Sequence, residues 1–144
     1  MPQSSVDTLF AEYGGYHTDP RNRFCHEIGI PLIVLSIQAL VRALPHGAVV
    51  VLAVTLAICV YYLVLARAQA IAAVVGMLVL LFLSAYVSWP WALALFVVGW
   101  ILQFVGHAYE GRKPAFLTNL VHLLVGPLWI GHILTTPPSS SSAP

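Results

Sequence analysis

The sequence predicts an all-α integral membrane protein: a helical bundle of four transmembrane helices with a kinked or re-entrant fifth segment. Two observations support this fold class. Hydrophobic residues make up 60% of the 144 residues, and the mean hydropathy of +0.90 is far above that of soluble domains. The apolar residues also fall into consecutive runs of roughly 17–20 residues, the length that a helix needs to cross a hydrocarbon core.

The small number of charged residues narrows the function classes. Six basic and five acidic residues nearly balance, so nothing favours binding to nucleic acid. Cys25 and Cys59 fit no zinc pattern, and both are interpreted as small apolar residues rather than disulfide partners. The first residues include Asp7 and Glu12 and lack a basic region. We therefore expect an uncleaved first membrane helix rather than a signal peptide.

The polar residues 1–27 are predicted to form a cytoplasmic N-terminal segment that carries two of the six histidines. Within it, residues 6–13 have the pattern of a short amphipathic helix lying on the membrane surface. The following Gly14 and Gly15 should end that helix.

Residues 28–135 are predicted to form the transmembrane helical bundle. Its first helix covers residues 28–44, with Pro31 in the first turn, where a missing N–H is harmless. A Pro-His-Gly break then leads to the second helix, residues 48–66, which Arg67 closes.

The next two predicted helices cover residues 68–87 and 92–110. Between them, residues 88–91 read as a turn with two tryptophans, which favour a membrane–water boundary.

The fifth segment, residues 114–134, is apolar but interrupted by Asn119, His122 and a Gly-Pro pair near its middle. It can span the membrane or enter it only partly, and a kinked helix packed on the bundle is favoured. The Ser- and Pro-rich tail, residues 136–144, is predicted to be disordered.

The basic residues predict the orientation. With the N-terminus in the cytoplasm and four alternating helices, five of the six basic residues face the cytoplasm, as the positive-inside rule requires. These are Arg21, Arg23, Arg67, Arg112 and Lys113, whereas Arg42 falls outside. This topology brings His17 and His26 to the same membrane face as His107, which ends the fourth helix.

A polar stripe runs along the fourth helix. Gln103, His107 and Glu110 are spaced i, i+4 and i+7, so they share one face of an otherwise apolar helix. Such a stripe should point into the bundle. Gly99 and Gly106 should allow a neighbouring helix to pack closely there.

Several histidines with a nearby carboxylate suit a divalent first-row metal such as iron, zinc or copper. Either three histidines, or two histidines and a carboxylate, leave positions for dioxygen and a substrate. Glu110 is then a ligand or the group that orients a ligand imidazole. From the residues alone, a shared site and three unrelated histidines at the membrane edge remain equally open. His46 and His132 fit simple polar anchors, whereas His122 lies near enough to be a candidate.

Two motifs resemble those of a known family. Residues 16–31 read YHTDPRNRFCHEIGIP, and residues 103–115 read QFVGHAYEGRKPA. Both are similar to signatures of the 2-hydroxy fatty acid dioxygenase family, and they occur in the right order at the right separation. Asn119-Leu120 and Gly126-Pro127 fit the family's closing segment, so the resemblance covers roughly residues 13–130, with its two middle helices matching only in apolar character.

The resemblance implies a membrane enzyme with Fe2+ as cofactor that uses dioxygen to shorten a 2-hydroxy long-chain fatty acid by one carbon. It assigns the metal to His17, His26 and His107, with His122 as a further candidate that departs from the family pattern. Glu110 matches the family's acid and is expected to be a catalytic residue. The expected substrate-binding residues are Gln103, Asn22 and Asn119, which match its amides, and Arg112, which is placed to pair with the substrate carboxylate. Setting the topology is the simpler role for Arg112 and Lys113.

Two alternatives stay open at this stage. The first is a non-catalytic lipid-binding or scaffolding membrane protein, in which the histidines would be dispensable. The second is another metal-dependent lipid enzyme, such as a hydroxylase, a desaturase or a zinc hydrolase, although hydroxylases and desaturases usually carry repeated histidine boxes. The bilayer is the expected surroundings in each case, and a homo-oligomer is neither required nor excluded.

Overall fold

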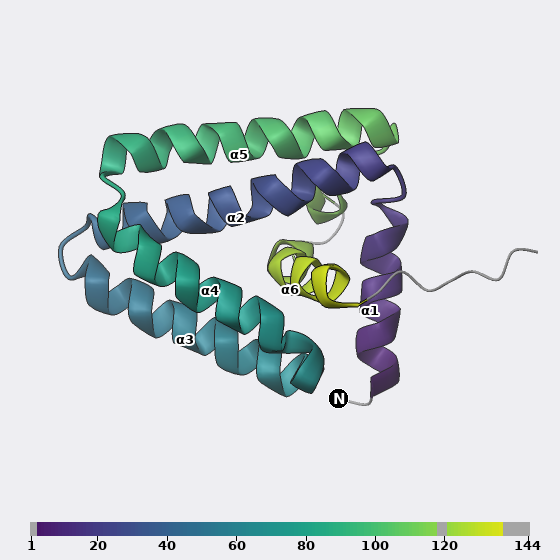
Figure 1. Cartoon of the computed structure of the whole chain (residues 1–144), viewed down its shortest axis with the longest axis horizontal. Coiled ribbons are helices and arrows are strands. Elements are labelled where there is room, and N and C mark those ends of the chain that lie inside the picture. Colours follow the sequence, from purple (N-terminus) through teal and green to yellow (C-terminus); the bar gives the residue numbers. More distant parts are fainter. Residues whose placement is uncertain (1–2, 118–120, 137–144) are drawn as a thin grey trace, which may run out of the picture.

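The computed structural model of the chain describes residues 3–117 and 121–136, and its regular structure there is entirely helical (Figure 1). The all-α prediction is therefore confirmed. The α-helices are α1 (Gln3–Gly15), α2 (Pro20–Arg42), α3 (Gly47–Ala66), α4 (Ile71–Leu83), α5 (Trp89–Glu110) and α6 (Val121–Thr135). Short 3-10 turns are η1 (Arg67–Ala70), η2 (Ser84–Tyr86) and η3 (Ala115–Leu117).

The long helices lie along one direction, and two shorter helices cross it. Figure 1 shows α2 and α5 side by side over most of their length, with α3 and α4 forming an antiparallel pair next to them. α1 crosses one end of this arrangement. α6 is seen nearly end-on, so it also runs across the long helices rather than along them. The predicted fifth segment thus packs on the bundle in a transverse direction.

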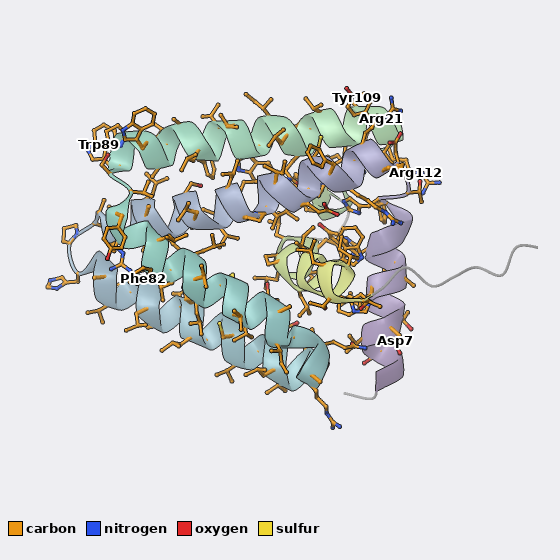
Figure 2. The ribbon with its side chains drawn as sticks, in the orientation of Figure 1. Asp7, Arg21, Phe82, Trp89, Tyr109 and Arg112 are labelled. Carbon is orange, nitrogen blue, oxygen red and sulfur yellow. The ribbon has the colours of Figure 1, made fainter. Side chains whose placement is uncertain are left out.

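Three described segments are long and apolar enough to cross a membrane: Pro20–Arg42, Gly47–Tyr86 and Trp89–Glu110. The second contains α3, η1 and α4 and therefore reverses direction within itself. The apolar helix Val121–Thr135 has 15 residues and is shorter than these spans. Large apolar side chains point outward along the long helices (Figure 2), as expected where lipid replaces water around a bundle.

The first long helix begins earlier than its apolar run. Asp19 caps it, because its side chain accepts a hydrogen bond from the backbone N–H of Arg21 (2.8 Å), and Pro20 takes the first turn, where no N–H is needed. The apolar run predicted that this helix starts at residue 28, whereas in the structure the Asp19 cap starts it at Pro20. This extension carries His26 on the helix instead of before it.

The third apolar run is shorter as a helix than predicted. Arg67 has a positive φ of 49°, which L residues rarely adopt, so α3 ends there and the chain turns back. The turn η1 and the turn η2 then occupy both ends of the predicted helix 68–87, leaving 13 residues in α4.

The fifth segment contains a helix that continues through its proline. α6 runs from Val121 to Thr135 with Pro127 inside it, so the Gly-Pro pair does not end the helix. The hydroxyl of Tyr62 on α3 donates to the backbone oxygen of Leu124, which joins α6 to α3 three residues before the proline. Asn119 and the tail 137–144 lie outside the described residues.

The buried core lies where α1, α3, α4 and α6 meet. α1 contributes Val6, Phe10 and Tyr13, each at most 6% exposed. α6 contributes Leu128 and Trp129, at 0% and 3% exposure. The apolar face of α1 is therefore covered by protein, and α1 closes the end of the bundle at which His17 and His107 lie.

Candidate metal centre

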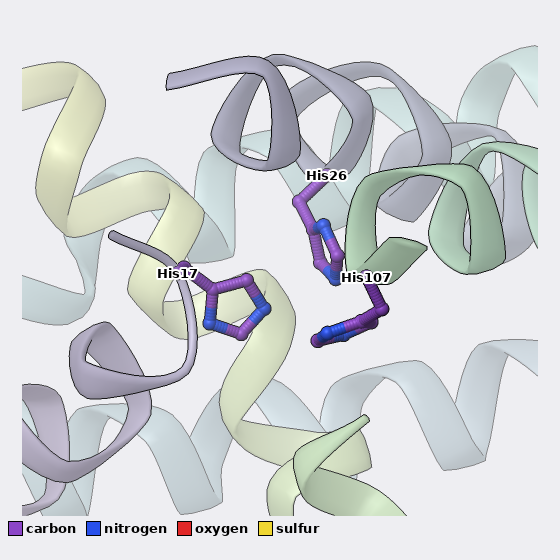
Figure 3. Close-up of side chains that lie close together, drawn as sticks. All are labelled: His17, His26 and His107. Carbon is purple, nitrogen blue, oxygen red and sulfur yellow. The ribbon is translucent and has the colours of Figure 1, made fainter. Parts of the chain in front are cut away.

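Three histidines from separate segments meet inside the bundle (Figure 3). His17 lies in the turn after α1, His26 in the second turn of α2, and His107 near the end of α5. Their ring centroids are 4.2 Å (His17–His26), 5.2 Å (His17–His107) and 4.9 Å (His26–His107) apart. One nitrogen of each ring lies within 4.8 Å of the others, and all three side chains are buried. The predicted proximity of these residues is confirmed.

Backbone carbonyls orient two of these rings. Nδ1 of His17 lies 2.7 Å from the carbonyl oxygen of Tyr13, and Nδ1 of His26 lies 2.9 Å from that of Asn22. Because a carbonyl only accepts, each Nδ1 carries the proton and each Nε2 keeps a free lone pair. The same second-nitrogen hydrogen bond accompanies most metal-binding histidines.

The centre also contains ring nitrogens that no described residue satisfies. Nε2 of His17 and Nδ1 of His107 are buried without a hydrogen-bond partner in residues 3–117 and 121–136. Leaving such groups unpaired is costly, and a bound cation would satisfy both lone pairs. The donor set therefore fits a divalent first-row metal.

Burial also keeps His17 in the form that binds metal. The loss of solvent around the ring lowers its pKa to about 4, against an ordinary value of 6.5, although its hydrogen bond to Tyr13 acts in the opposite direction. His17 is thus neutral at pH 7. A neutral imidazole can bind a metal ion without first losing a proton.

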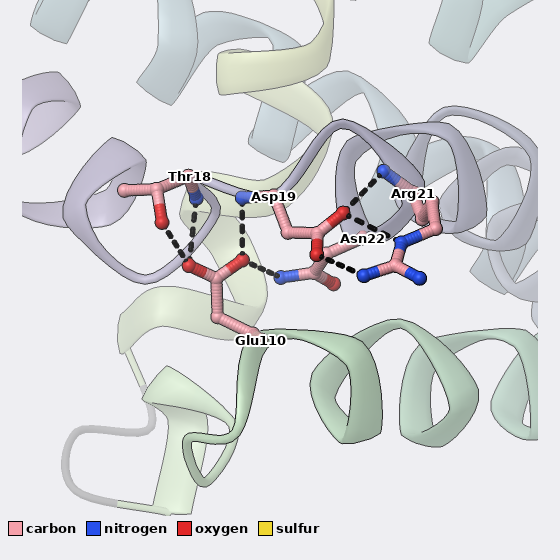
Figure 4. A network of polar contacts seen from close by, with 5 residues as sticks. All are labelled: Thr18, Asp19, Arg21, Asn22 and Glu110. Atoms are coloured by element: carbon pink, nitrogen blue, oxygen red, sulfur yellow. Dashed lines mark hydrogen bonds and ion pairs between the residues drawn. The ribbon is translucent and has the colours of Figure 1, made fainter.

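Glu110, at the end of α5, lies beside this centre. Its carboxylate accepts hydrogen bonds from the turn that follows His17 and from the start of α2 (Figure 4). One carboxylate oxygen accepts from the backbone N–H of Thr18 (2.9 Å) and from the hydroxyl of Thr18. The other accepts from the N–H of Asp19 (2.8 Å) and from the amide of Asn22 (3.0 Å). Both oxygens are therefore occupied by donors.

This network, Glu110 with Thr18, Asp19 and Asn22, connects the end of α5 to the start of α2. A carboxylate is also favourable at the N-terminus of a helix, where backbone N–H groups are unpaired. The network fixes the turn holding His17 relative to α2 and α5, which hold the other two histidines. The network therefore acts on the centre by holding the three histidines in position.

Gln103 and Asn22, both predicted to bind the substrate, lie in different surroundings. Gln103 is buried one turn before His107 and lines the cavity next to the histidines, and its Nε2 has no partner within the described part of the chain. Asn22 instead donates to Glu110 and, at 3.1 Å, to the carbonyl of Tyr16. It therefore helps to build the network around Glu110.

The remaining predicted residues lie further out. Arg112 is exposed and donates to the carbonyl of Gly15 (3.1 Å), which places it at the end of α1 rather than in the cavity. His122 is buried and lines the same cavity, but its ring is not part of the group of three. Its Nε2 lies 3.5 Å from Glu12. Asn119 lies outside the described residues.

Sequence reasoning did not identify the residues that hold His17. The ring of Tyr13 stacks on that of His17, with centroids 4.5 Å apart and an interplanar angle of 15°. Trp129 packs on the same ring at 5.1 Å, and Arg23 donates to the His17 carbonyl at 2.6 Å. The four-residue spacing of Tyr13 and His17, repeated in Asn22 and His26, is a signal from which the backbone hydrogen bonds could have been predicted.

A cavity of about 380 Å³ opens from the three histidines into the bundle. Its volume is within the range typical of small-molecule sites. At the histidine end it is bordered by Gln103, His122 and Tyr13, and from there it continues between apolar side chains of α2 and α3.

Comparison with known proteins gives the family. A family model described as "2-hydroxy-palmitic acid dioxygenase Mpo1-like" matches residues 3–137. The chain belongs to the Mpo1-like family. A relative from Saccharomyces cerevisiae (strain ATCC 204508 / S288c), named 2-hydroxy-palmitic acid dioxygenase MPO1, is 33% identical over 122 residues. The match covers 78% of this chain and 69% of the relative. No solved structure matches the chain. The resemblance seen in the two motifs is thus confirmed, and the three histidines belong to a chain of this family.

Proposed function

We propose that this protein is an Fe2+-dependent membrane dioxygenase that shortens 2-hydroxy long-chain fatty acids by one carbon. The observation that carries the proposal is the buried group of His17, His26 and His107, which has the composition and spacing of a metal site in a chain of the Mpo1-like family. The yeast relative's name supports the substrate class.

The proposed ligands are these three histidines. Fe2+, when bound, supplies a centre that can take up dioxygen and the oxygen atoms of a 2-hydroxy acid. Tyr13 and Asn22 keep the rings of His17 and His26 in the tautomer that leaves Nε2 free. Glu110 accepts hydrogen bonds and holds the segments together, so it acts as a positioning residue.

Other cavity residues are proposed to bind the polar end of the substrate. The side-chain N–H groups of Gln103 are buried and unpaired among the described residues, and we assign them to the substrate carboxylate or 2-hydroxyl. His122 borders the same space and is assigned to the substrate side of the centre. Arg112, bonded to Gly15, is assigned to the structure and topology of the chain.

The bilayer fits this assignment. The histidines lie near the ends of α2 and α5, where a carboxylate can stay close to the polar surface while its alkyl chain enters the bundle. We propose that this face is cytoplasmic, because most basic residues are at this end. The transverse α6 is proposed to stay at this face rather than cross.

Metal and oxygen measurements on the purified protein test the proposal. The wild type should retain about one iron per chain, consume dioxygen with 2-hydroxypalmitic acid and release the acid one carbon shorter. His26→Ala or His107→Ala should lose the iron and at least about 100-fold of the rate, since each removes a ligand. His46→Asn is the matched control, because His46 is exposed at a positive φ that Asn tolerates.

The outcomes separate the alternatives. Full activity in His107→Ala would rule out the metal assignment. A protein with no stoichiometric metal and no turnover would point to lipid binding without catalysis. Retention of zinc with no oxygen uptake would point to a hydrolase, because the ligands alone do not select the metal.

A further inference from the structure

The cavity that begins at the histidines continues as an apolar groove along α2. The residues of α2 that line it repeat every three or four positions, so they form one continuous face of the helix. They are His26, Ile30, Ile33, Val34, Ile37, Gln38 and Val41. The groove thus follows α2 from the metal centre almost to its C-terminal end.

The facing wall is α3, which runs back towards the histidines. Its lining residues also fall on one face, from Val50 and Val51 at the far end, through Val54 and Ile58, to Tyr62. Because both walls are regular helices, the groove keeps a constant direction. We call this space, from His26 to Val41 along α2, the α2–α3 groove.

The wall of the α2–α3 groove is almost free of polar groups away from the histidines. Among its described residues in the far half, Gln38 and Thr55 are polar, and they are bonded to each other at 3.2 Å. Gln38 also donates to the backbone oxygen of Met77 on α4 at 3.3 Å. Its amide donors therefore serve to join three helices. Apolar side chains provide the rest of the far half.

The length of the groove can be estimated from the helix. Fifteen residues separate His26 from Val41, so at a rise of ~1.5 Å per residue the two ends lie roughly 22 Å apart. An extended alkyl chain advances about 1.3 Å per carbon, since its bonds of ~1.5 Å form a zigzag. The groove therefore matches a chain of about 17 carbons.

We propose that the α2–α3 groove holds the alkyl chain of the substrate and that its end at Val41 and Val50 limits the length of the chain. The proposal rests on the function proposed above. The occupant is a saturated chain attached to a polar head, because the groove is apolar along its length and continuous with the buried histidines at one end.

Substitutions along one face of α2 test the limit. Val41→Trp should shorten the groove from its far end, and Ile37→Trp should shorten it by one further turn, about 6 Å or 4–5 carbons. Leu40→Trp is the matched control, because Leu40 neighbours Val41 on the same helix but does not line the groove. Rates are measured with saturated 2-hydroxy acids of about ten to twenty carbons.

The expected result is a graded change in the longest acid that is turned over. Wild type and Leu40→Trp should share a limit near 17 carbons in the alkyl chain, Val41→Trp should lower this limit by about 4 carbons, and Ile37→Trp by about 8. Val41→Ala, which adds space without risk of overpacking, should extend the limit by about 1–2 carbons. An identical limit in all five proteins would overturn the proposal.

A binding measurement separates this proposal from the enzymatic one. Saturated fatty acids of the same lengths compete with a fluorescent fatty acid for the purified proteins, and their affinities require no turnover. If the length limit of binding shifts in the variants while no 2-hydroxy acid is turned over, the groove is correct and the enzymatic function is wrong. If turnover is normal and neither limit shifts, the function stands and the groove does not hold the chain.

Discussion

At the scale of single residues, the charged carboxylate of Glu110 accepts hydrogen bonds from the backbone of another segment. Its carboxylate accepts hydrogen bonds from Thr18 and Asp19 in the turn before α2 and from Asn22 in the first turn of α2. Hydrogen bonds to a charged acceptor contribute more than neutral ones, about 1.5–3 kcal/mol each. The position of His17 relative to His26 and His107 therefore depends on Glu110, which is not one of the three histidines.

Replacement of Glu110 by Gln tests this role. The amide keeps one acceptor but turns an NH2 group towards N–H donors, so we expect a loss of about 1–3 kcal/mol in stability. Iron affinity should fall by about 10-fold while the rate per bound iron changes little, since the three histidines proposed as ligands remain. Calorimetry and iron titration measure the two effects. Glu27→Gln, a change of the same charge on α2 outside this network, should leave both unchanged. A variant that binds iron normally but has lost turnover would make Glu110 a catalytic residue instead.

The sequence predicted some of these residues and not others for a physical reason. His17, His26 and His107 could be brought together from the topology, because alternating membrane helices return to one face. The partners of Glu110 could not, since Thr18 and Asp19 contribute backbone N–H groups whose directions depend on the turn. Arg112 was placed with the substrate on its charge alone, whereas in the structure it bonds to the end of α1.

At the scale of helices, glycine determines how closely α2 and α5 approach. An added Cβ on Gly29 would lie 2.4 Å from Nε2 of Gln103 and 3.0 Å from the carbonyl oxygen of Gly99, and one on Gly99 would lie 3.1 Å from the carbonyl oxygen of Gly29. The two carbonyl oxygens are backbone atoms, which cannot move aside without moving the helix. The predicted close packing at Gly99 is confirmed, and Gly106 has a similar place against Asn22 and Cys25.

Gly29→Ala should therefore separate two of the proposed metal ligands, His26 on α2 and His107 on α5. We expect α2 to shift from α5 at a cost of about 1–3 kcal/mol, the usual range for overpacking, with weaker iron binding because His26 and His107 move apart. Gly76→Ala is the control: it lies within α4, its Cβ would meet nothing within 4 Å, and Ala favours a helix more than Gly. Thermal unfolding and iron titration compare the two variants. Equal iron affinity in both would show that the glycine contact does not position the centre.

The bounds of a helix were predictable where an apolar run is bounded by helix-breaking or charged residues. The second run, expected at residues 48–66, matches α3 to within one residue, because Gly47 and Arg67 bound it. The run 68–87 has Gln69 and Ser84 near its two ends, but neither residue type excludes a helix, so its two 3-10 turns were not foreseen. Tertiary packing decides such boundaries, as Arg42 shows by bonding Ser84 and the Leu81 carbonyl at one of them.

At the scale of the whole molecule, most basic residues lie at one end of the bundle. Figure 2 shows Arg21 and Arg112 at the end where α1 lies, and Phe82 and Trp89 at the other. The turn η1, with Arg67, lies at the α1 end, so the α3–α4 pair begins and ends at the far side. Arg42, the exception to the positive-inside rule, has its guanidinium hydrogen-bonded to α4 and η2 and is not a free surface charge.

Labelling of single cysteines tests the resulting topology. We expect Ala68→Cys and Lys113→Cys to react only from the cytoplasmic side, and His46→Cys and Ser88→Cys only from the opposite side, because α3 and α4 run antiparallel. All four positions are exposed, whereas the native Cys25 and Cys59 are buried and should not react with a membrane-impermeant maleimide. Labelling of intact cells and of inverted vesicles gives the side of each position. If Gly47–Tyr86 crossed the membrane once, His46→Cys and Ser88→Cys would instead react from opposite sides. Reaction of Lys113→Cys from outside would invert the orientation and place the histidines at the external face.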